Sequence, residues 1–210
     1  MKILRARSEE AKDDRRQALL EAALDEFFEK GFAASRMADI AKRAHLSKGT
    51  LYLYFDSKED LFKALVETLA APNIDQIESI AETSHSLEQA LAGMRALAPH
   101  IIRDTDLPRL IKVLIGDSHM FPTIVQAYRT QLIERVFSII AGILERAHAA
   151  GEIEVENAPL TARIVIAPIV LSALWQALFG RDPTAHVDLD KLFEIHTRLL
   201  LKALRPDPAS

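Results

Sequence analysis

The polar groups with the clearest chemistry in this chain lie between residues 48 and 54. Lys48 supplies a cation, Gly49 leaves its backbone uncovered, and Thr50 supplies a hydroxyl. Tyr52 and Tyr54 add two phenols. Cations, hydroxyls and backbone N–H groups bind DNA phosphates, whereas side chains near the start of a recognition helix contact base edges. We expect Thr50 and Tyr52 to contact bases, and Lys48 and Tyr54 to contact phosphates.

Two short helices around a tight corner would position these groups. Ser35 is a good helix N-cap, and apolar residues follow it at spacings of three and four, at Met37, Ile40, Ala41 and Ala44. His45 and Leu46 interrupt the pattern, and Ser47 offers a second N-cap, so a helix restarts after about three residues. That turn length is typical of a helix-turn-helix, whose second helix enters the major groove of DNA.

A third helix should begin after Ser57. The run Ser57-Lys58-Glu59-Asp60 is nearly a capping box, and the apolar stripe after it continues to Pro72. Because Pro72 lacks a backbone N–H, it should kink or end this helix. Lys58, beside the free N–H groups of a helix start, would bind a further phosphate. The full set of expected DNA contacts is Ser35, Arg36, Ser47, Lys48, Gly49, Thr50, Tyr52, Tyr54 and Lys58.

This segment resembles the DNA-binding domain of TetR/AcrR-type transcriptional regulators. The resemblance is carried by Asp39–Ala44, Ser47–Tyr52, Tyr54-Phe55 and Lys58–Leu61, and upstream by Ala22, Ala23, Phe27 and Phe28 followed by Gly31-Phe32. It covers about residues 12–65. His45 stands where the family more often has glycine, although histidine tolerates a positive φ better than most residues. Leu53 stands where many members have histidine.

The resemblance implies an all-α fold with two domains. Residues 1–65 would form a three-helix, helix-turn-helix DNA-binding domain, and residues 66–210 a larger helical domain for ligand sensing and dimerisation. We expect a repressor that binds a palindromic operator as a homodimer. A small apolar or amphipathic effector would release it by changing the spacing of the two recognition helices.

Composition agrees with this expectation. The 210 residues are 49% hydrophobic, which suffices for a sizeable core. There is no cysteine, and no apolar run approaches the roughly 20 residues of a membrane span. Residues 1–16 are polar and lack the apolar core of a signal peptide. We therefore expect a cytoplasmic protein without a membrane partner.

Charge is distributed unevenly along the chain. Residues 1–63 hold 13 Lys and Arg against 12 Asp and Glu, whereas residues 64–210 hold 13 against 18. The net charge of −4 therefore comes from the larger domain. Lys2, Arg5 and Arg7 lie on an N-terminal tail that would reach DNA or would simply be solvated.

The rest of the chain has helical periodicity. Helices are predicted at Leu87–Arg103, Leu107–Ser118, Pro122–Ala150, Pro159–Phe179 and Leu189–Leu204. Effector pockets in such domains are mostly apolar with a few polar groups. The candidates are His119, Phe121, Tyr128, Gln131, Arg135 and Trp175, although each would also fit a hydrogen-bonded place in the core.

The last two predicted helices favour dimerisation. Residues 164–179 are apolar nearly all around the helix, which requires burial on most sides. The two helices would form a four-helix bundle with a second copy, as the resemblance also implies; the alternative is a core helix buried within one subunit. The expected interface residues are Val165, Ile169, Ser172, Phe193, His196 and Leu200.

Other functional classes have little support in the sequence. The seven histidines are scattered, and Glu145-x-x-His148 matches the spacing of one di-iron ligand pair, whereas such a site needs further carboxylates as well. No glycine-rich loop suggests nucleotide binding, so we expect no metal, no cofactor and no catalytic residues. An architectural DNA-binding protein without an effector is the main alternative, and a solid core around Trp175 and Tyr128 would favour it.

Overall fold

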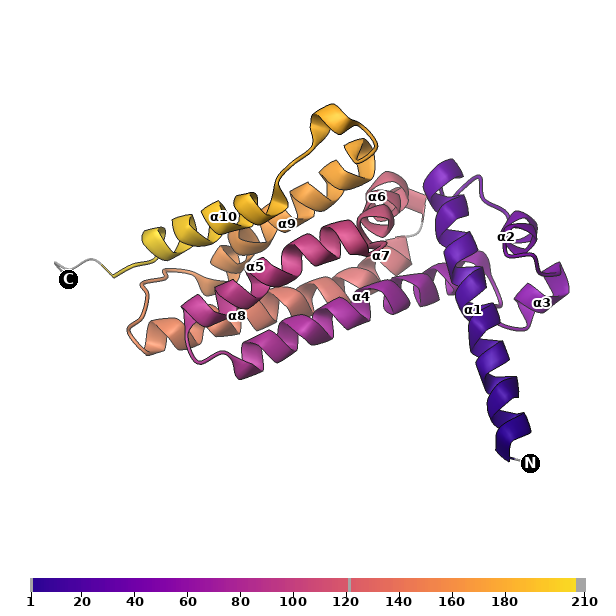
Figure 1. Ribbon diagram of the computed structural model, residues 1–210, viewed down its shortest axis with the longest axis horizontal. Helices are drawn as coiled ribbons and strands as arrows, with labels where there is room; N and C mark the ends of the chain where they lie inside the picture. Colours follow the sequence, from indigo (N-terminus) through magenta and orange to yellow (C-terminus); the bar gives the residue numbers. More distant parts are fainter. Residues whose placement is uncertain (1, 121, 207–210) are drawn as a thin grey trace. The chain divides into compact units, whose positions relative to one another are not determined.

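The computed structural model describes residues 2–120 and 122–206, and only the backbone of residues 2–8, 120 and 124. These ranges are helical and contain no strand, so the predicted all-α class is confirmed (Figure 1). The α-helices are α1 (Lys2–Lys30), α2 (Met37–Arg43), α3 (Lys48–Tyr52), α4 (Lys58–Thr83), α5 (Leu87–Asp104), α6 (Leu107–Asp117), α7 (Pro122–Tyr128), α8 (Glu134–Ala149), α9 (Ala158–Phe179) and α10 (Leu189–Ala203).

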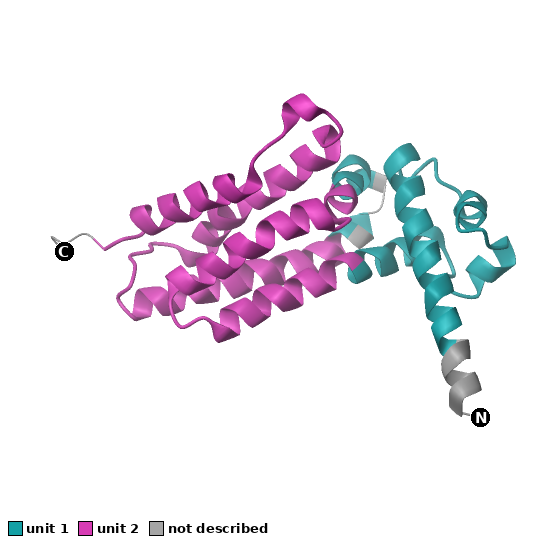
Figure 2. Ribbon diagram, in the orientation of Figure 1, with its two compact units in different colours: residues 1–68, 112–125 teal, residues 69–111, 126–210 magenta. Residues whose placement is uncertain are grey.

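The chain divides into two compact units (Figure 2). The smaller unit contains Met1–Thr68 and Lys112–Val125, and the larger unit contains Leu69–Ile111 and Gln126–Ser210. The expected division after residue 65 lies close to the first of these limits. It did not include residues 112–125, which pack with the smaller unit although they are distant in sequence.

Three phenylalanines form the centre of the smaller unit. Phe27, Phe32 and Phe62 have ring centroids 5.2, 5.4 and 5.5 Å apart, and each ring is almost fully buried. Ile40 of α2 and Leu51 of α3 are buried in the same unit. Burial of these apolar side chains fixes both short helices on α1 and α4, as the predicted apolar faces require.

The corner between α2 and α3 has the geometry of a left-handed helix cap. His45 has a φ of 55°, and its N–H donates to the carbonyl oxygen of Lys42 at 3.1 Å. The N–H of Leu46 donates to the carbonyl oxygen of Ala41 at 2.9 Å. Both bonds are those of a Schellman motif, so His45 takes the position that glycine usually fills.

Two details of the smaller unit differ from expectation. α1 begins at Lys2, so the backbone of the expected basic tail is the start of this helix; the side chains of Lys2, Arg5 and Arg7 lie outside the described residues. Ser35 is not the N-cap of α2, because that position belongs to Arg36.

Two predicted helix boundaries also differ. α4 continues through Pro72 to Thr83, and Asn73 donates from its side chain to the carbonyl oxygen of Leu69 at 2.8 Å, one turn earlier. The predicted helix Pro122–Ala150 is divided by a π-helical turn at Arg129–Ile133. One residue more per turn changes which side chains share a face, and the apolar spacing did not reveal it.

The larger unit is a layered helical bundle. α8 packs on α9, and α5 packs on α8, α9 and α10. α5, α9 and α10 each begin at a side-chain N-cap, provided by Ser86, Asn157 and Asp188. One core contains Leu91, Leu144, Val165 and Leu200, and a second contains Ile102, Ala173 and Phe193.

The expected dimer contacts lie largely inside this unit. Val165, Ser172, Phe193 and Leu200 are 3%, 8%, 2% and 8% exposed, and Ile169 packs against the second core. His196 is half-buried, interacts with the backbone of Ile164, and burial lowers its pKa. Val165, Ser172, Phe193 and Leu200 therefore lie inside the subunit, and their assignment to an interface with another subunit is corrected. Ile169 and His196 are only partly buried and stay predicted contacts.

A different face of α9 is exposed and apolar. Leu160, Ile164, Leu171 and Leu178 are 59%, 61%, 65% and 56% exposed, and their spacing places them along one side of the helix. We call these four residues the α9 stripe. Contrary to the expectation that no apolar run approaches a membrane span, α9 is long and apolar enough to cross a membrane, a property that core helices of soluble proteins share.

Candidate nucleic-acid interface

The start of α3 presents an exposed polar surface over a buried support. Leu51 faces the core with no exposed area, whereas Lys48, Gly49 and Tyr52 are exposed. Ser47 caps the helix, because its Oγ accepts from the N–H of Thr50 at 2.9 Å. The same Oγ lies 2.8 Å from the hydroxyl of Thr50, so both hydroxyls are ordered before any DNA binds.

The aromatic groups of this surface differ in exposure. Tyr52 is 43% exposed, and the ammonium of Lys48 lies 5.7 Å from the centre of its ring. Tyr54 is half-buried, with its ring 6.4 Å from that of Phe55. Leu53, between the two tyrosines, is 82% exposed. This arrangement makes Tyr52 the more accessible phenol and adds an apolar group beside it.

Lys58 does not present a free cation. Its Nζ donates to the carbonyl oxygens of Phe32, Ala33 and Ser35 at 2.5, 3.3 and 2.9 Å, and it lies 4.4 Å from the centre of the Phe32 ring. These bonds use all three donors of an ammonium group. Burial lowers the pKa of Lys58, against the raising effect of Glu59 and Asp117. We therefore remove Lys58 from the phosphate contacts and assign it a structural role.

The side chain of Ser35 is also buried and hydrogen-bonded within the protein. It is 3% exposed and donates to the carbonyl oxygens of Glu26 at 3.1 Å and Gly31 at 2.6 Å. A buried hydroxyl with internal partners is not available to DNA, so the predicted contact through this side chain is corrected. The neighbouring Arg36 is exposed at the start of α2 and stays a predicted phosphate contact.

Arg43 is paired within the protein and does not present a free cation. Its guanidinium binds Glu29 through two nitrogens, at 3.0 and 2.5 Å, and lies 3.2 Å from Glu26 and 3.7 Å from Asp25. The hydrogen bonds that Arg43 donates to Glu29 are the largest cause that raises the pKa of Arg43. This network ties α2 to α1, and Arg36, Lys42 and Lys48 are the exposed cations of the segment.

Two sequence profiles of known protein families match this chain. The sequence profile of bacterial regulatory proteins of the tetR family matches residues 19–65, which include α2 and α3. The profile of the AefR-like transcriptional repressor C-terminal domain matches residues 89–202, more than half of the chain. The chain belongs to the TetR family. It is therefore a DNA-binding transcriptional regulator, with α2 and α3 as the helix-turn-helix.

Individual TetR-family relatives agree. The uncharacterized HTH-type regulator YfiR of Bacillus subtilis is 33% identical over 98 residues, which are 43% of this chain and 48% of YfiR. YhgD of the same organism is 28% identical over 178 residues, 85% of this chain and 89% of YhgD. The crystal structure of B. subtilis FadR in complex with stearoyl-CoA shares the fold, with a TM-score of 0.70, 19% identity and coverage of 90% and 99%.

The candidate effector residues of this TetR-family chain are not gathered at one place. His119 is exposed and belongs to the smaller unit, Gln131 is exposed on the π-helical turn, and Phe121 lies outside the described residues. Arg135 donates to Glu78 at 2.7 and 2.5 Å and so joins α8 to α4. Tyr128 is half-buried, and burial raises its pKa.

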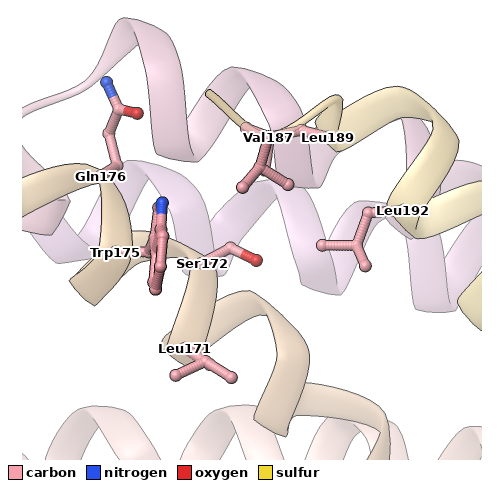
Figure 3. A pocket seen from close by; sticks show the side chains of 7 residues that line it. All are labelled: Leu171, Ser172, Trp175, Gln176, Val187, Leu189 and Leu192. Atoms are coloured by element: carbon pink, nitrogen blue, oxygen red, sulfur yellow. The ribbon is translucent and has the colours of Figure 1, made fainter. Parts of the chain in front are cut away.

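Trp175 is the candidate that lines a cavity. Its indole N–H donates to the carbonyl oxygen of Ala185 at 2.7 Å, and its ring is 42% exposed. The cavity has a volume of about 160 Å³ (Figure 3). Its walls come from α9, the loop before α10 and α10 itself, through Leu171, Ser172, Trp175, Gln176, Val187, Leu189 and Leu192.

Proposed function

We propose that this chain is a ligand-responsive repressor that binds a palindromic operator as a homodimer in the cytoplasm. The observation that supports this DNA-binding site is the exposure pattern at the start of α3. Lys48, Gly49 and Tyr52 are exposed there, whereas Leu51 beneath them is fully buried. Two subunits would place these helices about 34–36 Å apart, one turn of DNA. The matching AefR-like repressor profile supports repression rather than activation.

The α9 stripe supports the proposed dimer. Four large apolar side chains, each more than half exposed, lie along one side of α9. Aligned exposed apolar groups of this kind mark interaction surfaces. In an interface with two-fold symmetry the stripe of one subunit would pack on the same stripe of the other. The dimer would then bury eight of these apolar side chains, four from each subunit.

The cavity at Trp175 supports an effector rather than a purely architectural role. Figure 3 shows Trp175 and Ser172 on one side of the cavity and Leu192 on the other. An engineered apolar cavity of about 150 Å³ binds benzene, so about 160 Å³ suits a ligand portion of one aromatic ring. We infer an apolar or amphipathic effector with such a group. FadR shows that a relative of this fold holds stearoyl-CoA.

Effector action would follow from a shift between two arrangements of the dimer. A ligand changes DNA affinity only if it binds the DNA-competent and DNA-incompetent arrangements with different affinity. A tenfold loss of operator affinity therefore requires about a tenfold difference in effector affinity. The same linkage predicts that operator DNA weakens effector binding by an equal factor.

Salt dependence tests the DNA contacts of α3. We expect Lys48→Ala to weaken binding to a random duplex and to a duplex selected by the wild-type protein by similar factors, because Lys48 contacts phosphate. The slope of log affinity against log salt concentration should fall by about one. Tyr52→Ala should weaken mainly the selected duplex, by about 1–3 kcal/mol.

Lys63→Ala is the matched control for that titration. Lys63 is an exposed cation on α4, 3.9 Å from Glu67, and it lies outside the α3 surface. Its removal should leave both affinity and salt slope at the wild-type values. Wild-type affinity in a Lys48→Ala, Tyr52→Ala double variant would refute the site.

The single tryptophan of the chain reports directly on the cavity. We expect phenol, used as a one-ring probe, to change the fluorescence of Trp175 in a saturable manner with a Kd of about 1 mM. Val187→Phe should abolish this change, because a larger side chain would fill the cavity from its edge. Val170→Phe, at an exposed position of α9 outside the cavity, should leave it unchanged. A response that is absent, or that is linear in phenol, would contradict the assignment.

A further inference from the structure

The end of α6 contacts the loop between α1 and α2. The N–H of Phe32 donates to Oδ2 of Asp117 at 2.8 Å, across 85 residues of sequence. The neighbouring Gly31 has a φ of +81°, and a side-chain carbon built on it would lie 3.2 Å from the same carboxylate oxygen. The loop backbone therefore fits closely against Asp117 at a position that suits glycine.

The same loop is held from its other side by Lys58. Whereas the N–H of Phe32 binds Asp117, its carbonyl oxygen accepts from Lys58 at 2.5 Å. The Phe32 ring packs between Phe27 and Phe62. Both polar groups and the side chain of this one residue thus have fixed partners from α1, α4 and α6.

This loop determines where the helix-turn-helix lies. Only residues 31–36 separate the end of α1 from the start of α2. A segment of six residues with its first part fixed leaves α2 little freedom of direction, and α3 follows after the capped corner. A contact that fixes Phe32 therefore acts on the placement of α3.

A second contact shows that α6 is held against α1 over more than one turn. The ammonium of Lys112 lies 3.8 Å from the centre of the Phe28 ring, in the last turn of α1. Residues 112–125 pack with the smaller unit, whereas residues 107–111 of the same helix belong to the larger one. The end of α6 is thus a structural part of the DNA-binding unit.

We infer that Asp117 is a positioning residue for operator binding: its carboxylate fixes the α1–α2 loop and, through that loop, the direction of the recognition helix. This inference rests on the proposed function. It concerns a residue that has no contact with α3 of its own. It predicts a loss of selectivity for sequence, because base contacts require an exact direction of α3 whereas non-specific phosphate binding tolerates misplacement.

Three substitutions separate positioning from general stability. Asp117→Ala removes the acceptor, and we expect about a tenfold loss of affinity for a duplex selected from a random pool by the wild-type protein. Affinity for a random duplex should change less than twofold. Asp117→Asn keeps an acceptor oxygen and should remain within threefold of the wild type. Asp117→Glu keeps the charge but displaces the carboxylate by one methylene, and should weaken the selected duplex about threefold to fivefold.

Hydrogen exchange tests whether the effect of Asp117→Ala is confined to the α1–α2 loop. The amide of Phe32 should exchange at least tenfold faster in Asp117→Ala, while amides of α5, α8 and α9 keep wild-type rates. Asp106→Ala is the matched control, because it also removes one carboxylate from the same part of the sequence, where Asp106 pairs with Arg109. It should change neither the exchange of Phe32 nor duplex binding.

The outcomes distinguish this inference from the proposed function. A wild-type protein that selects no duplex contradicts the proposed function itself. If the wild type selects a duplex but Asp117→Ala binds it equally well, the inference is overturned, as it is if Asp117→Asn restores nothing. Should Asp117→Ala fail to fold, Asp117→Glu decides: wild-type selectivity in that variant overturns the inference.

Discussion

Leu171→Glu is expected to convert the dimer into monomers. Leu171 is 65% exposed at the centre of the α9 stripe. In a symmetric interface each dimer would bury two new carboxylates without partners, and each costs about 2 kcal/mol or more. The dimer Kd should therefore rise about a thousandfold. Sedimentation equilibrium at micromolar protein should show monomer for the variant and dimer for the wild type.

Operator binding should fall together with the dimer. A palindromic site engages both recognition helices, and a monomer has only one of them to contribute. We expect Leu171→Glu to retain the helix content of the wild type, because this side chain is already exposed in the subunit, yet to lose most of its affinity for a selected duplex. Retained fold with lost binding would separate an interface effect from unfolding.

Ile115→Glu is the control for this substitution. Ile115 is 57% exposed on α6 and lies outside the α9 stripe, so the same change of chemistry there should leave the dimer intact. Unchanged dimer mass in both Leu171→Glu and Ile164→Glu would refute the stripe as the interface. Binding of the wild-type protein to lipid vesicles, lost in Leu171→Glu, would instead indicate that the stripe contacts a membrane.

The helix-turn-helix was predictable because its determinants are local. The Ser47 cap, the apolar spacing of α2 and the short turn all lie within about 20 residues, and His45 occupies the left-handed position expected at the corner. Lys48, Gly49 and Tyr52 could be assigned to the exposed face because a short helix over a buried Leu51 leaves few choices of face.

The sequence-based predictions were wrong where a residue's bonding partners are distant in the sequence. They were also wrong where a helix is apolar on most sides, so that its pattern does not show which side faces the core. Lys58 binds carbonyl oxygens 23–26 residues away, and backbone acceptors leave no signature in the sequence. The bond from Phe32 to Asp117 spans 85 residues. α9 is apolar around most of its surface, so its sequence favoured burial on most sides and did not show which side faces its own subunit. Val165 and Leu171 could be told apart only in the folded unit.

Gly49→Ala should stabilise the protein and yet impair DNA binding. Gly49 lies in the first turn of α3 without a positive φ, so no backbone strain requires glycine there. A side-chain carbon at this position would meet only Oγ of Ser47, at 3.7 Å, which is ordinary contact. Because alanine reduces the entropy of the unfolded chain, we expect the free energy of unfolding to rise by about 0.5 kcal/mol.

DNA binding should change in the opposite direction. Glycine at an exposed helix start permits close approach of a phosphate to the backbone, and a methyl group would keep that phosphate out of hydrogen-bonding distance. Loss of one hydrogen bond to a charged group costs about 1.5–3 kcal/mol, or roughly ten- to a hundredfold in affinity. Both random and selected duplexes should be affected, because the contact is with phosphate.

Gly142→Ala provides the matched comparison, because it too lies in a helix where an added carbon meets only a flexible side chain, at 3.6 Å from Arg146. It should raise the melting temperature to a similar or greater extent and leave DNA affinity unchanged. Opposite signs for stability and affinity at Gly49, with no change of affinity at Gly142, would identify close approach of DNA as the reason for glycine in α3. Wild-type DNA affinity in Gly49→Ala would show that Gly49 does not contact DNA closely. Lys48 and Tyr52 would then remain as the contacts at this surface.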